Sequence, residues 1–357
     1  MNKRVLSRLL GGAVFAAALG WASSGAWAGQ DVTVPSGLAS VFPVCGNGNA
    51  GGGAPCDNVP TGNTVTVDGG VLGDVSGAQN TADGTDVTGN KVTVNGSVTG
   101  TVYGGYHMPP ASIPAVADSN TVTVNSGSEV DGGVYGGWAH SLLSTSDASS
   151  NTVEINGGTI SGSIVGGYAD FLGNVGHGSA TGNTVTIQGS PTFTNVDALD
   201  GGRAGASSGN TLNLHVTGLT VGDLAFFQTL NFFLPTGLNN GGTMLNTTTA
   251  ELPALPGGAV VNVSLEGAGP ALSLGNSYNL IASGVTGDID PASATGVVGG
   301  FNYTLAVTDG KLVLTLGSPV IKPAAAAAAI PALDAPALAA LALLLAGMAW
   351  AGLRRRG

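Results

Sequence analysis

One short segment brings carboxylates and a cation together with a spacing that suits acid–base chemistry. Asp197, Asp200 and Arg203 follow one another at intervals of three residues. Polysaccharide hydrolases and lyases need clustered carboxylates beside an Arg, Lys or His that stabilises charge or moves protons. The same residues also fit an ion pair at a corner of the chain, a common and weak interaction. We expect the ion pair and no catalytic residue.

The histidines do not form a recognisable site either. His107, His140, His177 and His215 lack the spacing of metal ligands, and we expect them in solvent. No Ser, His and Asp arrangement, phosphate loop or dinucleotide fingerprint stands out in the sequence. We therefore expect a protein that is not an enzyme and that uses no metal or cofactor.

The two cysteines enclose the 12-residue segment CGNGNAGGGAPC, from Cys45 to Cys56. A redox or metal pair is the functional alternative, but the CxxC spacing is missing. In an oxidising compartment a segment of this kind favours a disulfide. We expect the bond to tie down an N-terminal cap over residues 29–59.

The elements that position these residues follow from a phrase repeated six times. Each copy is an Asn followed by an alternating apolar run, as in NTVTV, and alternation with period two is typical of half-buried strands. Repeats of about 30 residues indicate a stacked array whose turns bury a common core. The copies begin at Asn63, Asn90, Asn120, Asn151, Asn183 and Asn210. We predict a β-solenoid over residues 60–220, with the Asn side chains bonded from turn to turn.

A second phrase, such as VYGGY, recurs behind the first and contains paired glycines. We expect these glycines at sharp corners or close backbone approaches, where positive φ is available to them. If the glycine pairs stack from turn to turn, the residue after each pair belongs to one column, and Tyr103 and Tyr135 form a partial second column. Such a surface suits sugar rings or extended polymers, or the side chains stack only on one another as a ladder. The column consists of Tyr106, Trp138, Tyr168 and Arg203.

Charge excludes one class of partner. The formal net charge is −11, and between residues 29 and 329 the only Lys and Arg are Lys91, Arg203, Lys311 and Lys322. Phosphate-binding surfaces need clustered cations. We therefore expect no binding to nucleic acid and none to an anionic membrane surface.

Both ends of the chain have the pattern of targeting segments. Residues 1–28 combine a basic start, an apolar stretch and Ala-Trp-Ala, which predicts a signal helix cut by signal peptidase before Gly29. Residues 335–353 are uncharged, and Arg354, Arg355 and Arg356 follow, which predicts a transmembrane helix with a cytoplasmic basic end. Residues 318–329 would be a Pro/Ala linker.

The region after the repeats carries a family resemblance. Residues 221–317 contain FQTLNFFLPTGLNNGGTML and end in YTLAVTDGKLVLTL, where Asp309-Gly310 predicts a hairpin. Together with the repeats, this region resembles the passenger of bacterial autotransporter proteins. The resemblance implies a right-handed parallel β-helix outside the cell, often adhesive. We do not expect the membrane β-barrel of that family after Gly317.

The tail resembles the IPTL-CTERM sorting signal, a proline-leucine motif followed by a hydrophobic helix and a basic end. That resemblance implies retention at the inner membrane until an exosortase-type transpeptidase processes the protein, and the alternative is a plain single-span anchor. The family usually has Thr third, where this chain has Ala332. The motif over residues 330–357 comprises Ile330, Pro331, Ala332, Leu333, Arg354, Arg355 and Arg356.

These observations predict an all-β protein: a right-handed parallel β-helix with a C-terminal β cap, between a signal helix and a transmembrane helix. The function we expect is that of an exported, surface-anchored structural or adhesin-like protein of the bacterial envelope. A β-solenoid carbohydrate-active enzyme and a self-assembling matrix component are the alternatives.

Overall fold

The computed structural model describes residues 31–37, 39–40, 44–46, 60–82, 84–110, 112–171, 178–253, 257–320 and 335–354. It divides into two units, Met1–Ser318 and Pro319–Gly357, which are treated separately here. The signal peptide, most of the linker, the motif residues Ile330 to Leu333 and the last two arginines lie outside the described residues.

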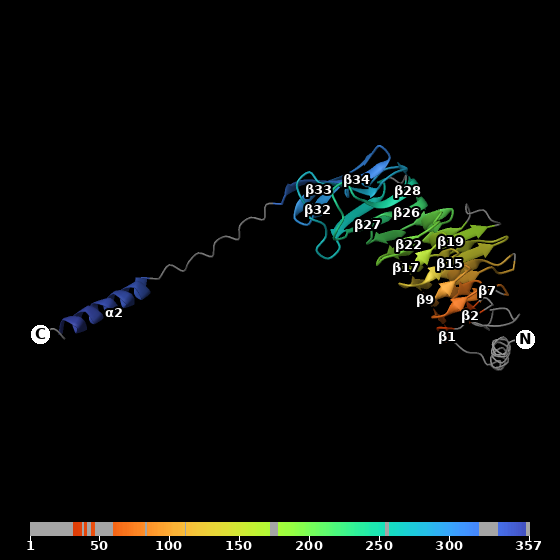
Figure 1. Cartoon of the computed structure of the whole chain (residues 1–357), viewed down its shortest axis with the longest axis horizontal. Helices are drawn as coiled ribbons and strands as arrows, with labels where there is room; N and C mark the ends of the chain where they lie inside the picture. The colour runs from red at the N-terminus through yellow and green to blue at the C-terminus, as the bar shows by residue number, and fades with distance from the viewer. Residues whose placement is uncertain are drawn as a thin grey trace, which may run out of the picture. The chain divides into compact units, whose positions relative to one another are not determined.

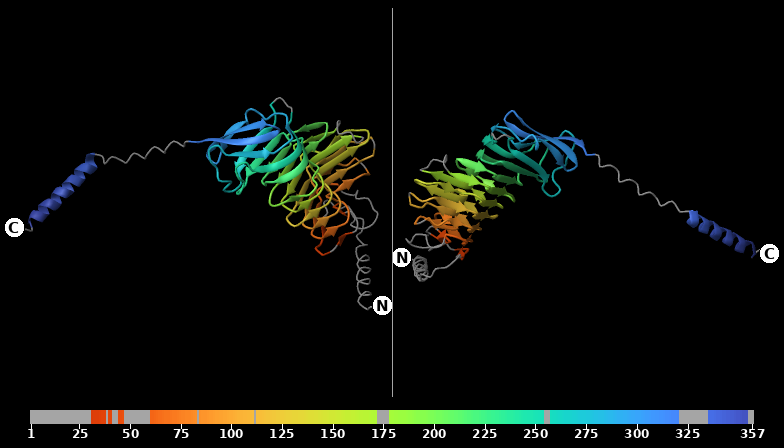
Figure 2. Two further views of the ribbon diagram at one scale, coloured as in Figure 1. Left: turned by 45° about the horizontal axis from the view of Figure 1, so that its top comes forward. Right: turned by 180° about the vertical axis from the view of Figure 1, so that it is seen from behind.

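The first unit is an all-β solenoid of right-handed type, in which the strands of successive turns lie side by side (Figure 1, Figure 2). Its first sheet holds the repeated Asn phrases. The strands of this sheet, in spatial order, are β1 (Asp31–Val34), β4 (Thr64–Val67), β9 (Lys91–Val94), β13 (Thr121–Val124), β17 (Thr152–Ile155), β21 (Thr184–Ile187), β25 (Thr211–Leu214), β27 (Thr229–Leu234) and β29 (Val260–Leu265). All of them pair in parallel and in register.

The second sheet forms a narrow side of the solenoid. Its strands are β2 (Ala39–Ser40), β5 (Gly70–Val71), β10 (Ser97–Val98), β14 (Glu129–Val130), β18 (Thr159–Ile160) and β22 (Thr192–Phe193). Every pairing in it is parallel.

The third sheet contains the glycine pairs. Its strands, in spatial order, are β3 (Val44–Cys45), β6 (Val75–Ser76), β11 (Val102–His107), β15 (Val134–Ser141), β19 (Ile164–Phe171), β23 (Ala198–Arg203), β26 (Leu219–Ala225), β28 (Thr243–Glu251), β30 (Ser277–Ile281), β34 (Lys311–Pro319), β33 (Phe301–Thr308) and β32 (Thr295–Val298), while β7 (Gln79–Asn80) pairs with β11 and β31 (Val285–Thr286) with β28.

The core follows from the alternation within each strand. Successive side chains of a strand face opposite sides of the sheet. In the four-residue repeat strands of the first sheet, the second and fourth residues are apolar and point inward. Burying each such side chain stabilises the fold by about 1.5 to 3 kcal/mol. The half-buried strands predicted from the alternation are confirmed: one residue of each repeat forms an inward column in which every member is 0 % exposed, namely Val65, Val92, Val122, Val153, Val185 and Leu212.

A fourth sheet, which was not anticipated from the sequence, creates a side extension of the solenoid. It contains β24 (Ala206–Ser208), β20 (Ser179–Thr181), β16 (Ser146–Asp147), β12 (Ala115–Asp118) and β8 (Val87–Thr88). We call these strands, with the parts of β11, β15 and β19 beyond the glycine pairs, the flange. Its own small core is built of alanines: Ala115, Ala117, Ala139, Ala148, Ala169, Ala180 and Ala204.

The solenoid continues past the repeats and then changes character. Strands β26 to β29 still pair in parallel with the turn before them, whereas β30 pairs with β34, and β32 with β33, in antiparallel fashion. The predicted hairpin is confirmed: β33 and β34 are neighbours joined by Asp309 (φ 50°) and Gly310 (φ 68°), as a type I′ turn requires.

The second unit contains the helix α2 (Ala335–Arg354). Among the residues that the structure describes, no helix is both long enough and apolar enough to cross a bilayer. The prediction of a transmembrane helix over residues 335–353 is therefore not confirmed.

Candidate functional site

A ladder of buried asparagines lies where the flange joins the first sheet. At each step the Oδ1 of one Asn accepts the backbone N–H of the Asn one turn earlier. Asn120 thus donates its N–H to Asn151 Oδ1 at 2.9 Å and its Nδ2 to the same oxygen at 3.2 Å. Asn151 Nδ2 donates in turn to the carbonyl of Ala117 on the flange strand β12, at 2.9 Å. This confirms the predicted turn-to-turn bonding of the Asn side chains, which fasten the flange to the solenoid.

The paired glycines are needed because of close approach and not because of positive φ. A Cβ on Gly136 would lie 2.3 Å from the carbonyl oxygen of Gly166, one turn along. A Cβ on Gly137 would lie 2.2 Å from the oxygen of Ala117 and 2.6 Å from Asn151 Nδ2. None of the paired glycines of β11, β15, β19 and β23 has a positive φ. Of the two predicted roles, the close backbone approach is confirmed and the corner with positive φ is wrong; the second glycine makes room for the Asn ladder.

On the outer face of the third sheet, the predicted column is in register. Tyr106 pairs with Trp138, Trp138 with Tyr168, and Tyr168 with Arg203. Tyr103 pairs with Tyr135 in the parallel column on the other side of the glycines. The register thus gathers five half-buried rings over three turns, which we call the aromatic face: Tyr103, Tyr106, Tyr135, Trp138 and Tyr168.

The rings of the aromatic face contact one another. Trp138 is central, with ring centroids 4.6 Å from Tyr168 and 4.8 Å from Tyr135, and its ring is tilted by 43° and 51° to theirs. Tyr103 and Tyr135 stack at 5.5 Å with an interplanar angle of 22°. Such pairs contribute about 0.5 to 1.5 kcal/mol beyond the area they bury. The rings therefore form a stabilising ladder, and their role in ligand binding stays a prediction.

An ion pair closes the last turn of the aromatic face. Arg203 Nη1 lies 3.8 Å from Asp200 Oδ2, and the guanidinium lies 5.9 Å from the centroid of Tyr168. Burial raises the pKa of Asp200 to about 7, and the positive charge of Arg203 opposes only part of that shift. Asp197 is exposed. The structure thus brings Asp200 and Arg203 together as the predicted ion pair.

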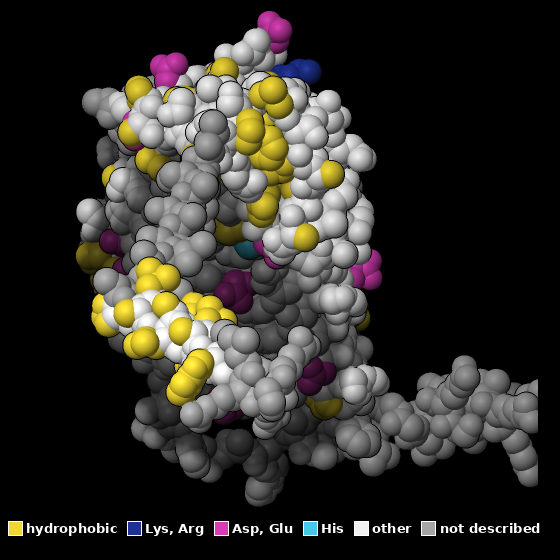
Figure 3. All heavy atoms as spheres, turned by 90° about the vertical axis from the view of Figure 1, so that its left-hand side faces the viewer, with side chains coloured by type: hydrophobic (Ala, Val, Ile, Leu, Met, Phe, Trp, Pro, Cys, Tyr) yellow, Lys and Arg dark blue, Asp and Glu magenta, His cyan; other side chains and the backbone are white. Residues whose placement is uncertain are grey.

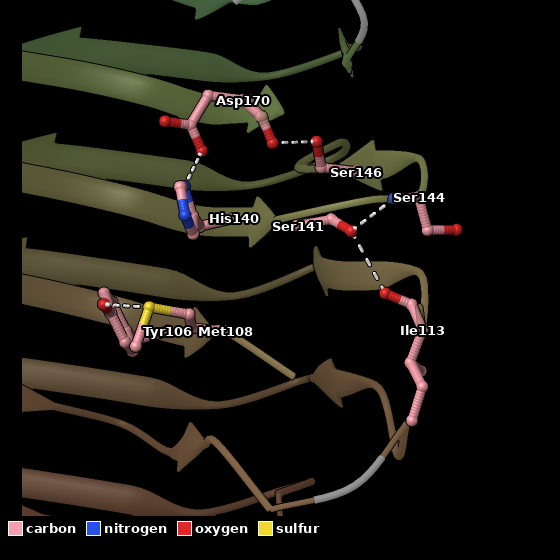
Figure 4. Close-up of polar contacts among 8 residues, drawn as sticks. All are labelled: Tyr106, Met108, Ile113, His140, Ser141, Ser144, Ser146 and Asp170. Carbon is pink, nitrogen blue, oxygen red and sulfur yellow. Dashed lines mark hydrogen bonds and ion pairs between the residues drawn. The ribbon is translucent and has the colours of Figure 1, made fainter. Parts of the chain in front are cut away.

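The flange adds a second pair, which sequence reasoning missed. His140 Nδ1 lies 2.5 Å from Asp170 Oδ1, and both side chains lie on the flange strands two residues beyond the aromatic column (Figure 4). His140 follows Trp138, and Asp170 follows Tyr168, at the same offset, so the column register itself predicts their contact. The pair places a carboxylate beside the aromatic rings.

The expectation of solvated histidines is wrong for all three that the structure describes. His107 takes the place of an alanine in the flange core; it is 0 % exposed, and its Nδ1 accepts the N–H of Val116 at 2.8 Å. His215 stacks on Phe233, with centroids 3.9 Å apart, and its Nδ1 lies 2.7 Å from Glu266 Oε2. His177 lies outside the described residues. Each of the three therefore has a structural partner.

Other predicted features are tested in part. Cys45 is buried and disulfide-bonded, whereas Cys56 lies outside the described residues. In the described ranges, no three His, Cys, Asp or Glu side chains come close enough together to hold a metal ion. Among the described side chains in the view of Figure 3, Asp and Glu are scattered and few are Lys or Arg.

Comparisons with known proteins bear on the tail alone. The IPTL-CTERM motif matches residues 328–356, although Ala332 replaces the usual Thr. Such signals are processed by an exosortase-type enzyme and point to export and anchoring at the cell surface. No curated protein and no solved structure matches the chain. The resemblance to autotransporter passengers therefore stays a prediction.

Proposed function

We propose that this protein is a non-enzymatic, adhesin-like protein of the cell surface whose aromatic face binds a polymeric glycan. The observation that supports this most is the gathering of five half-buried rings on one outer face, in a chain that is only 5% aromatic. Sugar rings present C–H faces that pack on aromatic side chains, and Tyr and indole polar atoms suit their hydroxyl groups.

The arrangement of the rings favours a long ligand. Three successive turns present aromatic side chains, and neighbouring strands lie about 4.8 Å apart. A polymer lying along the solenoid axis contacts several turns at once, so that weak contacts add through a high effective concentration. The sorting signal, the predicted signal peptide and the resemblance to autotransporter passengers all support the placement of this face outside the cell.

A carbohydrate-active enzyme is the second candidate, and the raised pKa of Asp200 favours it, because a protonated carboxylic acid can act as a general acid near pH 7. Against it, the charged groups that the structure describes around this face do not gather into one cluster: His140 contacts Asp170, Arg203 contacts Asp200, and Asp74 accepts the backbone N–H of Thr101. Loss of glycan cleavage in the Asp200→Asn variant would support the enzyme and overturn the adhesin-like function.

The binding function is tested by removing the central ring. Trp138→Ala should weaken retention on a panel of immobilised polysaccharides by about three- to tenfold, in line with one or two lost ring contacts. Phe233→Ala is the matched control, since Phe233 is a half-buried ring stacked on His215, away from the aromatic face. Circular dichroism verifies that both variants keep their fold. Equal retention of folded Trp138→Ala and wild type would leave the aromatic face a purely structural ladder.

A further inference from the structure

The charges around the aromatic face are unbalanced. Asp74 borders it at the first turn, where its Oδ1 accepts the N–H of Thr101, two residues before Tyr103. Asp170 borders it in the flange, and Asp200 occupies the Tyr103–Tyr135 column one turn beyond Val165. Asp200, with a pKa of about 7, is mostly protonated at pH 6, which leaves Asp74 and Asp170 as the two carboxylates that act on the rings.

The cations that oppose these carboxylates are few. Over residues 60–220 the only Lys and Arg are Lys91 and Arg203. Lys91 lies on β9 of the first sheet, and Arg203 is held within 3.8 Å of Asp200. His140 Nδ1 contacts Asp170 Oδ1. Arg203 lies beside Tyr168 at the last turn, so the negative surrounding is that of Tyr103 and Tyr106, at the other end of the aromatic face.

The electrostatic effect of the carboxylates reaches the rings themselves. Burial is the main reason that the pKa values of Tyr103 and Tyr106 are raised, and the charge of Asp74 adds to both shifts. Asp170 acts in the same direction on Tyr106 and Tyr168. A negative charge on a bound ligand would be disfavoured for the same reason, and a positive charge favoured.

We propose that the ligand of the aromatic face is a polysaccharide with free, protonated amino groups, that is, an amino-sugar polymer with unacetylated units. This inference rests on the proposed glycan-binding function and specifies the class of glycan. Ammonium groups bind over Tyr and Trp rings by cation–π contact and are attracted by Asp74 and Asp170. Uronic acid and sulfated polymers would meet the same carboxylates with like charge.

The test compares polymers that differ in one group. Purified full-length protein is titrated at pH 6 against chitosan, acetylated chitin oligomers, polygalacturonate and polylysine by biolayer interferometry. Chitosan should bind about tenfold more tightly than the acetylated chain, and polygalacturonate should not bind. Added salt should weaken chitosan binding, because exposed charges are screened.

Two charge variants locate the effect. Asp74→Asn keeps an oxygen to accept the Thr101 N–H and should lower chitosan affinity by about threefold, with no loss for the acetylated chain. Asp68→Asn is the matched control, since Asp68 accepts a bond from Asn95 on the outer ladder of the first sheet. Equal losses in both variants would mean a non-specific charge effect and overturn the inference.

The remaining outcomes separate this inference from the function on which it rests. Equal affinity for acetylated and unacetylated polymers overturns the inference and supports glycan binding. Equal affinity for polylysine and chitosan overturns the amino-sugar assignment in favour of cationic polymers in general. Binding to none of the saccharides overturns both proposals.

Discussion

Replacing one rung of the Asn ladder tests how the flange is held. In Asn151→Ala the N–H of Asn120 loses its acceptor and the carbonyl of Ala117 loses its donor, and both groups are in the buried part of the structure. An unsatisfied buried polar group costs about 1 to 3 kcal/mol. Two such groups should lower the free energy of unfolding by about 2 to 6 kcal/mol. For a fold of ordinary marginal stability this is a large fraction of the total.

A second asparagine ladder on the outer surface provides the control. Asn125 Nδ2 donates to Asn95 Oδ1 at 2.7 Å, and Asn156 Nδ2 donates to Asn125 Oδ1 at 3.1 Å. Solvent can replace these bonds, so Asn125→Ala should cost less than about 1 kcal/mol. The assay is urea unfolding of the full-length protein followed by circular dichroism. If the two variants share one midpoint, the buried ladder does not fasten the flange in the way described.

Three further changes follow from the same structure. Gly136→Ala should destabilise the solenoid, because its Cβ meets a carbonyl oxygen at 2.3 Å, whereas Gly317→Ala, with its nearest atom at 3.6 Å, should be nearly neutral; equal melting temperatures would contradict this. Asp200 binds its proton more tightly in the folded state, with a pKa of about 7 against an ordinary 3.8, so the free energy of unfolding should fall as pH rises from about 4 to about 7. Asp200→Asn should flatten that part of the profile, and an unchanged slope would show that other groups cause it. Deletion of residues 335–357 removes most of the sorting motif and should therefore abolish anchoring at the cell surface and release the protein; an unchanged amount at the surface would show that another segment anchors it.

The sequence predicts the solenoid well because each copy of the Asn repeat carries two independent signals. The alternation of Val122 and Val124 orients the strand, and Asn120 sets its register against the next turn. The aromatic column follows from that register. The Asn63 turn contains the equivalent segment, Val75 to Asn80, but Ala78 and Gln79 stand in place of the second glycine and the aromatic residue, so the sequence phrase is not recognisable there.

The flange could not be predicted from local patterns. Its return strands are only two to four residues long and are rich in Ala and Ser, which have weak strand preference. These short strands form because the outer parts of β11, β15 and β19 pack against them and because the Asn ladder donates hydrogen bonds to their carbonyl groups. The contact of His140 with Asp170 was missed for a related reason, since neither residue has a signal of its own and only the shared register joins them.

The Asn–Gly junction also separates two kinds of sequence change. The segment from the residue after the glycine pair to the next ladder asparagine varies in length. It spans 15 positions between Tyr168 and Asn183 but only 7 between Arg203 and Asn210, and both asparagines still belong to the same ladder. The length of the flange segment therefore differs from one turn to the next, while the strands of the first sheet keep their register. The junction thus lets one turn differ in length from the next while the strands of the first sheet stay in register.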